Sequence, residues 1–204
     1  MVGFGKREQT MSFYNKGHRS VQARFSSADL ADRLEQVTHR TTLNSEDQIF
    51  VNSASFFFLA TADAEGRPDC SYKGGAPGFV RVASPNLIIF PDYDGNGMFR
   101  SLGNVLVNPS VALLFIALGT TAKRLRINGR AELRFDDPMM SEFIGAQALV
   151  RVTPEHIFPN CPRYIHDLSS ATASLYTPNA SEPPLEPAWK GFDAFKDVVP
   201  PRKA

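Results

Sequence analysis

The most constraining feature of the sequence is a long alternation of apolar and polar residues from Lys123 to Phe135. Successive side chains of a strand point to opposite faces, so this pattern predicts a β-strand with one face in a core. The apolar positions are Leu125, Ile127, Gly129, Ala131, Leu133 and Phe135. The polar positions are Arg124, Arg126, Asn128, Arg130, Glu132 and Arg134. Four arginines facing one way indicate either an anion-binding sheet face or an ordinary solvated one.

Further strands are expected on the N-terminal side of this segment and after it. Residues 55–62 and 67–73, joined by a turn at 63–66, should form an antiparallel hairpin. The uninterrupted apolar run 111–118 is typical of a strand buried on both faces. Shorter strands are expected at 79–83, 87–90 and 148–157. This count of six or seven strands, with only short helices between, predicts a mainly β protein, a small antiparallel barrel with peripheral helices.

Residues 86–109 are expected to form a strand, a loop and a short helix. Pro91 should end the strand, and a helix that starts near Gly97 must stop before Pro109. At about 100° per residue, one side of this helix carries Met98, Phe99, Leu102, Val105 and Leu106. The other side carries Arg100, Ser101 and Asn104. An arginine and a hydroxyl beside free backbone N–H groups favour an anion such as a phosphate. An ordinary amphipathic connector is the alternative.

The two ends of the chain differ from its middle. Residues 13–25 mix aromatic and basic side chains and should form an arm that packs on another surface, such as a partner subunit. Ser27 can cap a helix over 29–38, and Ser45 with Gln48 forms a capping-box pattern for a second helix. The expected domains are an N-terminal arm and helix at 1–42, a barrel at 43–158, and a C-terminal segment at 159–204 that packs on the barrel or a partner.

Composition excludes several classes of protein. A net charge of +1 gives no electrostatic reason to expect nucleic acid or a membrane surface as a partner. The longest apolar run is far shorter than the ~20 residues that cross a bilayer, and the N-terminus lacks the apolar core of a signal peptide. Two cysteines make no disulfide framework, and the four histidines lack the spacing of a zinc site. We therefore expect a soluble cytoplasmic protein without a metal.

The run from Phe56 to Leu133 resembles the pyridoxamine 5'-phosphate oxidase-like family of flavin-nucleotide-binding split barrels. The matching pieces are FFFLATADAEGRPDCSYKGG, NLIIFPDYDGN, FRSLGNVLVNPSVALLF and KRLRINGRAE. Their order and spacing carry the resemblance, and the insertion KGGAPG is similar to the flavin-nucleotide-binding branch. The resemblance implies a six-stranded split barrel that pairs as a homodimer. It also implies one FMN in each of two clefts at the subunit interface.

The resemblance implies which residues lie along the flavin ring. Ser71 and Lys73 match positions that contact the ring and the ribityl chain. Phe90 and Pro91 match the end of a strand beside the flavin. A lysine near the ring could stabilise negative charge on reduced flavin.

Other residues match the phosphate end of the cofactor. Arg100 and Ser101 match the pair that grips the FMN phosphate, and Asn104 lies one turn further along the same face. Arg124 matches a strand position that contacts FMN across the dimer. Asn96, in the turn before the helix, completes the expected set of cofactor-binding residues.

Two departures separate this chain from the true oxidase. The phosphate site of that enzyme usually carries two adjacent basic residues, whereas the second here is Ser101, so Arg124 or Arg126 would have to supply the missing charge. The Arg-x-His substrate motif is replaced by WKGFDAF and PPRKA near the C-terminus. Pyridoxine phosphate is therefore expected to be a poor substrate.

The leading hypothesis is a homodimeric FMN-dependent oxidoreductase that acts on an unidentified small-molecule substrate. One alternative is a non-catalytic split barrel that stores or senses flavin, or haem with His156 as a ligand. Another is a deazaflavin-dependent reductase on the same fold. Cys161 belongs either to a lid over the flavin or to the core, and Cys70 is most simply a core residue.

Overall fold

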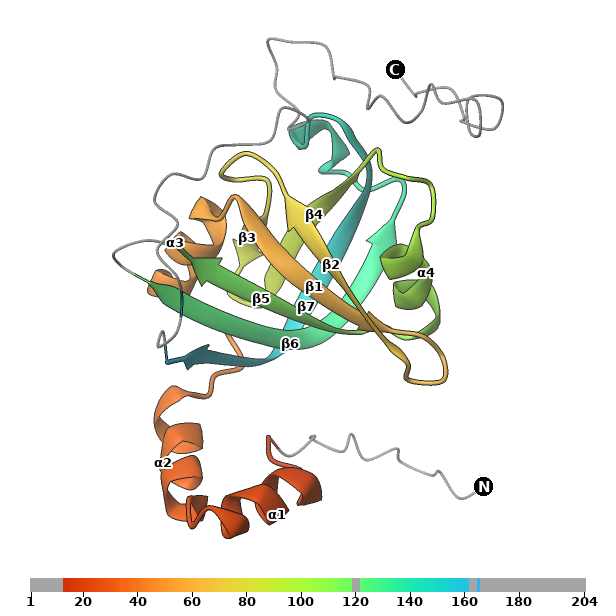
Figure 1. Cartoon of the computed structure of the whole chain (residues 1–204). Coiled ribbons are helices and arrows are strands. Elements are labelled where there is room, and N and C mark those ends of the chain that lie inside the picture. The colour runs from red at the N-terminus through yellow and green to blue at the C-terminus, as the bar shows by residue number, and fades with distance from the viewer. Residues whose placement is uncertain (1–12, 119–121, 162–164, 166–204) are drawn as a thin grey trace, which may run out of the picture. The chain divides into compact units, whose positions relative to one another are not determined.

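The computed structural model describes residues 13–118, 122–161 and 165 (Figure 1). The chain divides into two compact units, one that ends at His39 and one that begins at Arg40. Most of the C-terminal segment lies outside the described residues, so its packing on the barrel or a partner stays a prediction. The domain boundaries expected from the sequence also stay predictions.

The first unit consists of two helices, α1 (Lys16–Arg24) and α2 (Ala28–Thr38). A capping box starts α1, because Asn15 Oδ1 accepts from the His18 N–H and His18 Nδ1 accepts from the Asn15 N–H. Much of the segment expected to be an arm is therefore helical. The predicted helix α2 is confirmed with Ser27 at its N-cap position, although the Ser27 side chain makes no capping hydrogen bond.

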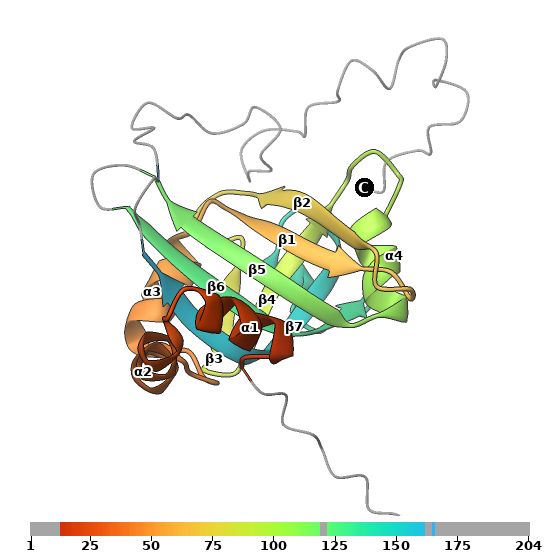
Figure 2. The ribbon, with the colours of Figure 1, turned by 60° about the horizontal axis from the view of Figure 1, so that its bottom comes forward.

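The second unit is built on a seven-stranded antiparallel sheet in the order β2-β1-β5-β6-β7-β4-β3. Its strands are β1 (Phe56–Ala62), β2 (Pro68–Gly74), β3 (Arg81–Ser84), β4 (Leu87–Tyr93), β5 (Ser110–Ala117), β6 (Lys123–Arg134) and β7 (Ala146–Asn160). Figures 1 and 2 show a strongly curved sheet in which β1, β2 and β5 lie opposite β3 and β4.

The six-stranded barrel implied by the resemblance needs correction, because the sheet has seven strands and does not close. Seven strands agree with the six or seven predicted from the residue pattern. The four-residue strand β3 pairs with β4 alone in the described part of the chain. Strand β2 likewise pairs only with β1 there. Both edges are therefore left open, although the predicted hairpin of β1 and β2 and the antiparallel architecture are confirmed.

The core fills the concave face of the sheet. Phe57 lies at its centre, with its ring centroid 5.1 Å from that of Phe115 and 5.0 Å from that of Phe90. The alternation predicted for β6 is confirmed, because its apolar positions up to Ala131 are buried and its arginines from Arg126 onward are exposed. Strand β5 is buried on one face only, so the prediction of burial on both faces is wrong. Its outward side chains are half-buried.

Strand β4 continues through Pro91 to Tyr93, so the predicted stop at Pro91 is wrong. In the described part of the chain, the pairing with β3 reaches only as far as Ile89, and beyond that residue β4 pairs with β7 alone. A proline is tolerated at such a position because its missing N–H can face the unpaired side. This extension keeps Asp92 within the sheet instead of a loop.

Three short helical elements complete the second unit. Helix α3 (Ser45–Ser53) begins with a capping box formed by Asn44 and Asp47, one residue before the one predicted from Ser45. Helix α4 (Arg100–Val107) ends before Pro109, as predicted. A 3-10 turn, η1, covers Met140–Glu142. Helices α3 and α4 lie at opposite ends of the curved sheet (Figure 1). No helix in the described part of the chain is both long and apolar enough to cross a membrane.

Candidate cofactor-binding cleft

Polar contacts hold α4 against the edge of the sheet formed by β1 and β2. The Oγ atoms of Ser101 and Ser71 are 3.0 Å apart, and Ser101 is buried. One turn later, Asn104 Nδ2 donates to Thr61 Oγ1 at 3.0 Å. Leu102 and Val105 of the same helix pack into the core. The helix is therefore fixed to the sheet by hydroxyl and amide groups as well as by apolar side chains.

The prediction of which side of α4 is buried was partly wrong. Met98, Phe99 and Leu106 are exposed, although the pattern placed them on the apolar face. Ser101 is buried, although it was placed on the polar face. The reason is that β2 offers the hydroxyl of Ser71, which lets a polar side chain face the sheet.

Helix α4 begins without a side-chain cap. Its N-cap residue, Phe99, has a left-handed conformation with φ of 47° and makes no capping hydrogen bond through its side chain. A non-glycine residue rarely adopts this conformation. The N–H groups at an uncapped helix start carry partial positive charge and have no partner within the helix. This helix start is chemically suited to an anion.

A cleft with a volume of about 280 Å³ opens beside the start of α4. Its walls come from β2, from the end of β4, from the loop that follows β4 and from the first turn of α4. Five of the residues predicted to bind the cofactor line this cleft: Ser71, Lys73, Asn96, Arg100 and Ser101. The structure therefore brings together segments that are about 30 residues apart in the chain.

The family model for pyridoxamine 5'-phosphate oxidase matches residues 43–161, more than half of the chain. This chain belongs to the pyridoxamine 5'-phosphate oxidase-like family. No curated protein gives a significant match.

Solved structures similar to this member of the pyridoxamine 5'-phosphate oxidase-like family include HupZ from Group A Streptococcus. It shares 19% identity, the match covers 57% of this chain and 93% of that chain, and the TM-score is 0.46. HutZ, the heme storage protein from Vibrio cholerae, shares 23% identity over 55% of this chain and 90% of its own, with a TM-score of 0.39. A FAD-binding protein from Mesorhizobium loti shares 15% identity over 59% of this chain and 94% of its own, with a TM-score of 0.43. These values assign no function to the present chain.

The other four residues predicted to bind the cofactor lie outside the cleft of this family member. Phe90 and Pro91 are buried within β4. Asn104 is occupied with Thr61, one turn beyond the start of α4. Arg124 lies on β6, where its Nη2 donates to the carbonyl of Cys161.

Arg124 nevertheless has an incomplete set of hydrogen bonds. Its Nε is buried without a hydrogen-bond partner in the described structure, and so is Oδ1 of Asn160, the residue opposite it on β7. Buried polar atoms are normally paired. Among the described residues, two buried polar atoms at this corner of the sheet are thus without a hydrogen-bond partner.

Neither cysteine lies in the core. Cys70 is exposed on β2, so its prediction as a core residue is wrong, and Cys161 is exposed at the end of β7. The cleft lining includes no histidine among the described residues. In the same part of the chain, no group of histidine, cysteine, aspartate or glutamate residues could hold a metal.

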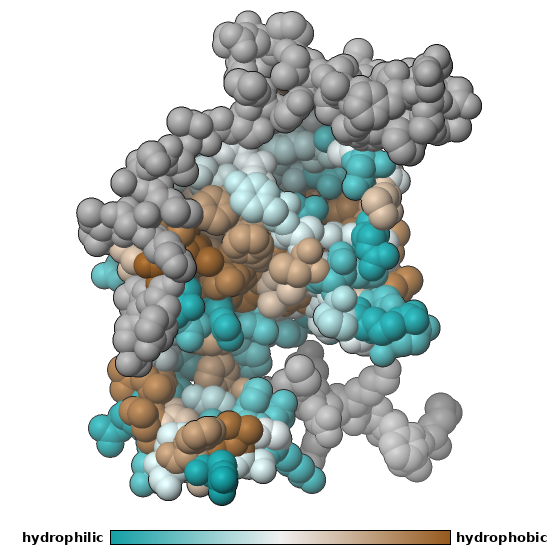
Figure 3. Space-filling view, viewed as in Figure 1, coloured by the Kyte–Doolittle hydropathy of each residue, from teal (hydrophilic) through white to brown (hydrophobic). Residues whose placement is uncertain are grey.

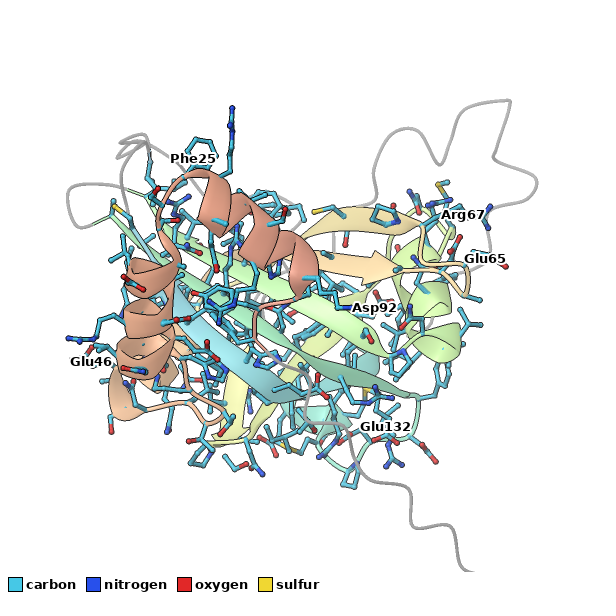
Figure 4. All side chains as sticks on the ribbon, turned by 90° about the horizontal axis from the view of Figure 1, so that it is seen from below. Phe25, Glu46, Glu65, Arg67, Asp92 and Glu132 are labelled. Carbon is cyan, nitrogen blue, oxygen red and sulfur yellow. The ribbon has the colours of Figure 1, made fainter. Side chains whose placement is uncertain are left out.

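Two acidic residues of the cleft, Asp69 and Asp92, were not singled out from the sequence. Asp69 shares one face of β2 with Ser71 and Lys73, and its Oδ1 lies 3.5 Å from Arg100 Nε. Asp92, labelled in Figure 4, accepts from Gln147 Nε2 at 2.9 Å through Oδ2. Their place in the sequence could have identified both residues. Asp69 comes two residues before Ser71 on β2, and Asp92 directly follows Pro91 on β4.

The electrostatics of Asp92 reflect its half-buried position. Burial raises the pKa of the Asp92 carboxyl, and the hydrogen bond from Gln147 and the charge of Lys73 oppose that rise. Among the described lining residues, Asp69 and Asp92 balance Lys73 and Arg100, so the side chains give the cleft no net charge. Any attraction of the cleft for an anion would therefore come from the position of Arg100 and from the N–H groups at the start of α4.

Proposed function

We propose that this family member binds FMN in the cleft beside α4 and acts as an oxidoreductase on a small-molecule substrate. The observation that carries the proposal is that the uncapped start of α4 opens into a cleft lined by Arg100 and the Ser71–Ser101 hydroxyl pair. The phosphate of FMN would accept hydrogen bonds from the helix N–H groups and the hydroxyls, and would pair with the guanidinium. When bound, FMN supplies hydride or electron transfer.

The residues at the other end of the cleft suit the ring of the cofactor. Lys73 lies two residues beyond Ser71 on the same face of β2, which is about 7 Å along a strand. Its ammonium would stabilise negative charge on the ring, and Asn96 would offer hydrogen bonds from the loop. Ser71, proposed for the phosphate end, and Lys73, proposed for the ring end, thus lie in one row along β2.

The size of the cleft supports a second copy of the chain as part of the site. Its volume of about 280 Å³ lies just below the ~300–1,000 Å³ of ordinary small-molecule pockets. One subunit would therefore seat the phosphate and part of the ribityl chain, while a further wall is needed for the ring. This is the reason to propose a homodimer.

The outer face of the sheet is suited to such a partner. Apolar side chains gather over β1 and β5 in the space-filling view (Figure 3). They include Phe58 and Leu114, which lie side by side on these strands and are only half-buried. The exposed ring of Tyr72 stacks on Phe56 at 5.4 Å on the same face. A second copy would cover these side chains and could complete the hydrogen bonds of Arg124.

The absorption spectrum and the flavin affinity of the purified full-length protein test the proposal. We expect the bands of bound flavin and a lower Kd for FMN than for riboflavin, which lacks the phosphate. We also expect sizing to give about twice the monomer mass. A Soret band would instead support the haem alternative, and binding of a deazaflavin but not FMN would support the reductase alternative. A strict monomer that binds neither flavin would overturn both the cofactor and the dimer.

A further inference from the structure

Arg100, the proposed phosphate-binding arginine, faces an anion that belongs to the chain itself. Its Nε lies 3.5 Å from Asp69 Oδ1, and the two side chains are 62% and 24% exposed. Hydrogen bonds between charged groups are shorter, about 2.7–2.9 Å between nitrogen and oxygen. The pair is therefore a loose ion pair rather than a clamp that fixes the guanidinium.

The position of Asp69 places its charge inside the proposed site. Asp69, Ser71 and Lys73 follow one another on the face of β2 that lines the cleft. A phosphate held by Arg100 and the Ser71–Ser101 hydroxyl pair would lie close to the Asp69 carboxylate. The carboxylate and the phosphate would therefore compete for the same guanidinium.

We infer that Asp69 is a specificity-determining residue that competes with the phosphate of FMN for Arg100 and keeps the cofactor exchangeable. The inference rests on the proposed function. Asp69 sets how strongly the site prefers FMN to riboflavin, because it withholds Arg100 from the phosphate, and riboflavin has no phosphate for Arg100 to bind. The cleft consequently holds FMN more weakly than Arg100 and the start of α4 alone would allow.

A purely structural role for Asp69 has less support. Exposed ion pairs contribute little to the free energy of unfolding. The seat of α4 on the sheet is also fixed by other contacts, which join Ser101 to Ser71 and Asn104 to Thr61. The charge of Asp69 is therefore not needed to hold the helix in place.

The test compares FMN and riboflavin affinities of the full-length protein and of Asp69→Asn, measured by quenching of flavin fluorescence at low ionic strength. We expect Asp69→Asn to lower the Kd for FMN by roughly three- to tenfold and to leave the Kd for riboflavin unchanged. The matched control is Asp92→Asn, which removes the same charge from the same cleft but has no ion pair with Arg100. It should change the ratio of the two Kd values less.

A second readout asks whether the effect passes through Arg100. In an Arg100→Gln background, the gain from Asp69→Asn should shrink, because there is no longer a guanidinium to compete for. An unchanged or weaker FMN affinity in Asp69→Asn would overturn the inference, as would a full gain without Arg100. The proposed function would survive either result if the unmodified protein still prefers FMN to riboflavin. Equal affinities for the two flavins in the unmodified protein would remove the phosphate site, and the inference with it.

Discussion

Helices α3 and α4 lie at opposite ends of the same curved sheet, and they begin in different ways (Figure 1). The start of α3 is satisfied by the chain itself, since Asn44 caps it and the buried carboxylate of Asp47 is paired with Arg40 at 2.8 Å. The start of α4 has no side-chain cap and opens into a cleft. At the α3 end of the sheet, called the closed end below, the helix start is thus capped within the chain. At the α4 end, called the open end, the helix start leaves hydrogen-bonding groups for a ligand.

The carboxylates of the two ends show the same difference. Asp47 accepts two donors of the Arg40 guanidinium, from Nε at 3.1 Å and from Nη2 at 2.8 Å. Among the described residues, Asp69 has only its loose pairing with Arg100, and Asp92 has the side-chain amide of Gln147. Carboxylates at the closed end should therefore matter for stability, and those at the cleft should matter for ligand affinity.

The largest effect is expected at the closed end. Asp47→Ala should lower the free energy of unfolding by about 2 to 3 kcal/mol, because it removes a buried partner of Arg40 and half of the capping box of α3. Urea unfolding followed by circular dichroism measures this loss. The control is Glu46→Ala, an exposed carboxylate one residue earlier on α3 (Figure 4), which should change stability little. A loss of equal size in both variants would contradict the distinction between the two ends.

The next effect is expected at the open end and should fall on affinity. Arg100→Gln should raise the Kd for FMN by about 10- to 100-fold, because a charge-assisted hydrogen bond to the phosphate is lost. The Kd for riboflavin and the unfolding midpoint should stay close to those of the unmodified protein, since Arg100 is largely exposed. Fluorescence titration and urea unfolding measure the two quantities.

A matched arginine separates a local effect of Arg100 from a general loss of charge. Arg67 lies at the tip of the hairpin of β1 and β2 (Figure 4) and pairs with Asp63 and Glu65, away from the cleft lining. Arg67→Gln should leave FMN affinity unchanged. If it weakened FMN as much as Arg100→Gln does, the assignment of the phosphate to the start of α4 would be lost.

The sequence predicts most of the sheet because its signals are local. The alternation along β6 and the turn between β1 and β2 depend on residues close in the chain, and both features are confirmed. The end of β4 depends instead on how far β3 reaches, so a proline such as Pro91 does not decide it. The number of strands and the open edges are likewise set by pairing between distant segments.

The candidate site is predictable only in part for the same reason. Arg100 and Lys73 were expected beside a ligand, and both line the cleft. The pairing of Asp69 with Arg100 depends on how β2 and α4 meet, and no pattern within either segment reports it. The burial of Ser101 also depends on a hydroxyl about 30 residues away in the chain.

The smallest effect on stability is expected at Asp92, and the direction of this effect distinguishes the α4 end of the sheet from the α3 end most clearly. Burial raises the pKa of this carboxyl in the folded protein above the value of about 3.9 of an unfolded aspartate. Ionisation therefore destabilises the folded state, and the penalty is absent below pH ~4 and complete once the pH exceeds the raised pKa. Asp92→Asn, whose side-chain oxygen can still accept from Gln147, should relieve that penalty.

The variant should thus be slightly more stable than the unmodified protein at neutral pH, and the difference should vanish as the pH falls and Asp92 becomes protonated. Urea midpoints measured between pH 4 and pH 8 follow this difference. If Asp92→Asn instead lost stability at neutral pH and recovered in acid, the ionised carboxylate would be stabilising, as at Asp47. The α4 end of the sheet would then resemble the closed end, and its polar groups would be paired within the chain instead of being left for a ligand.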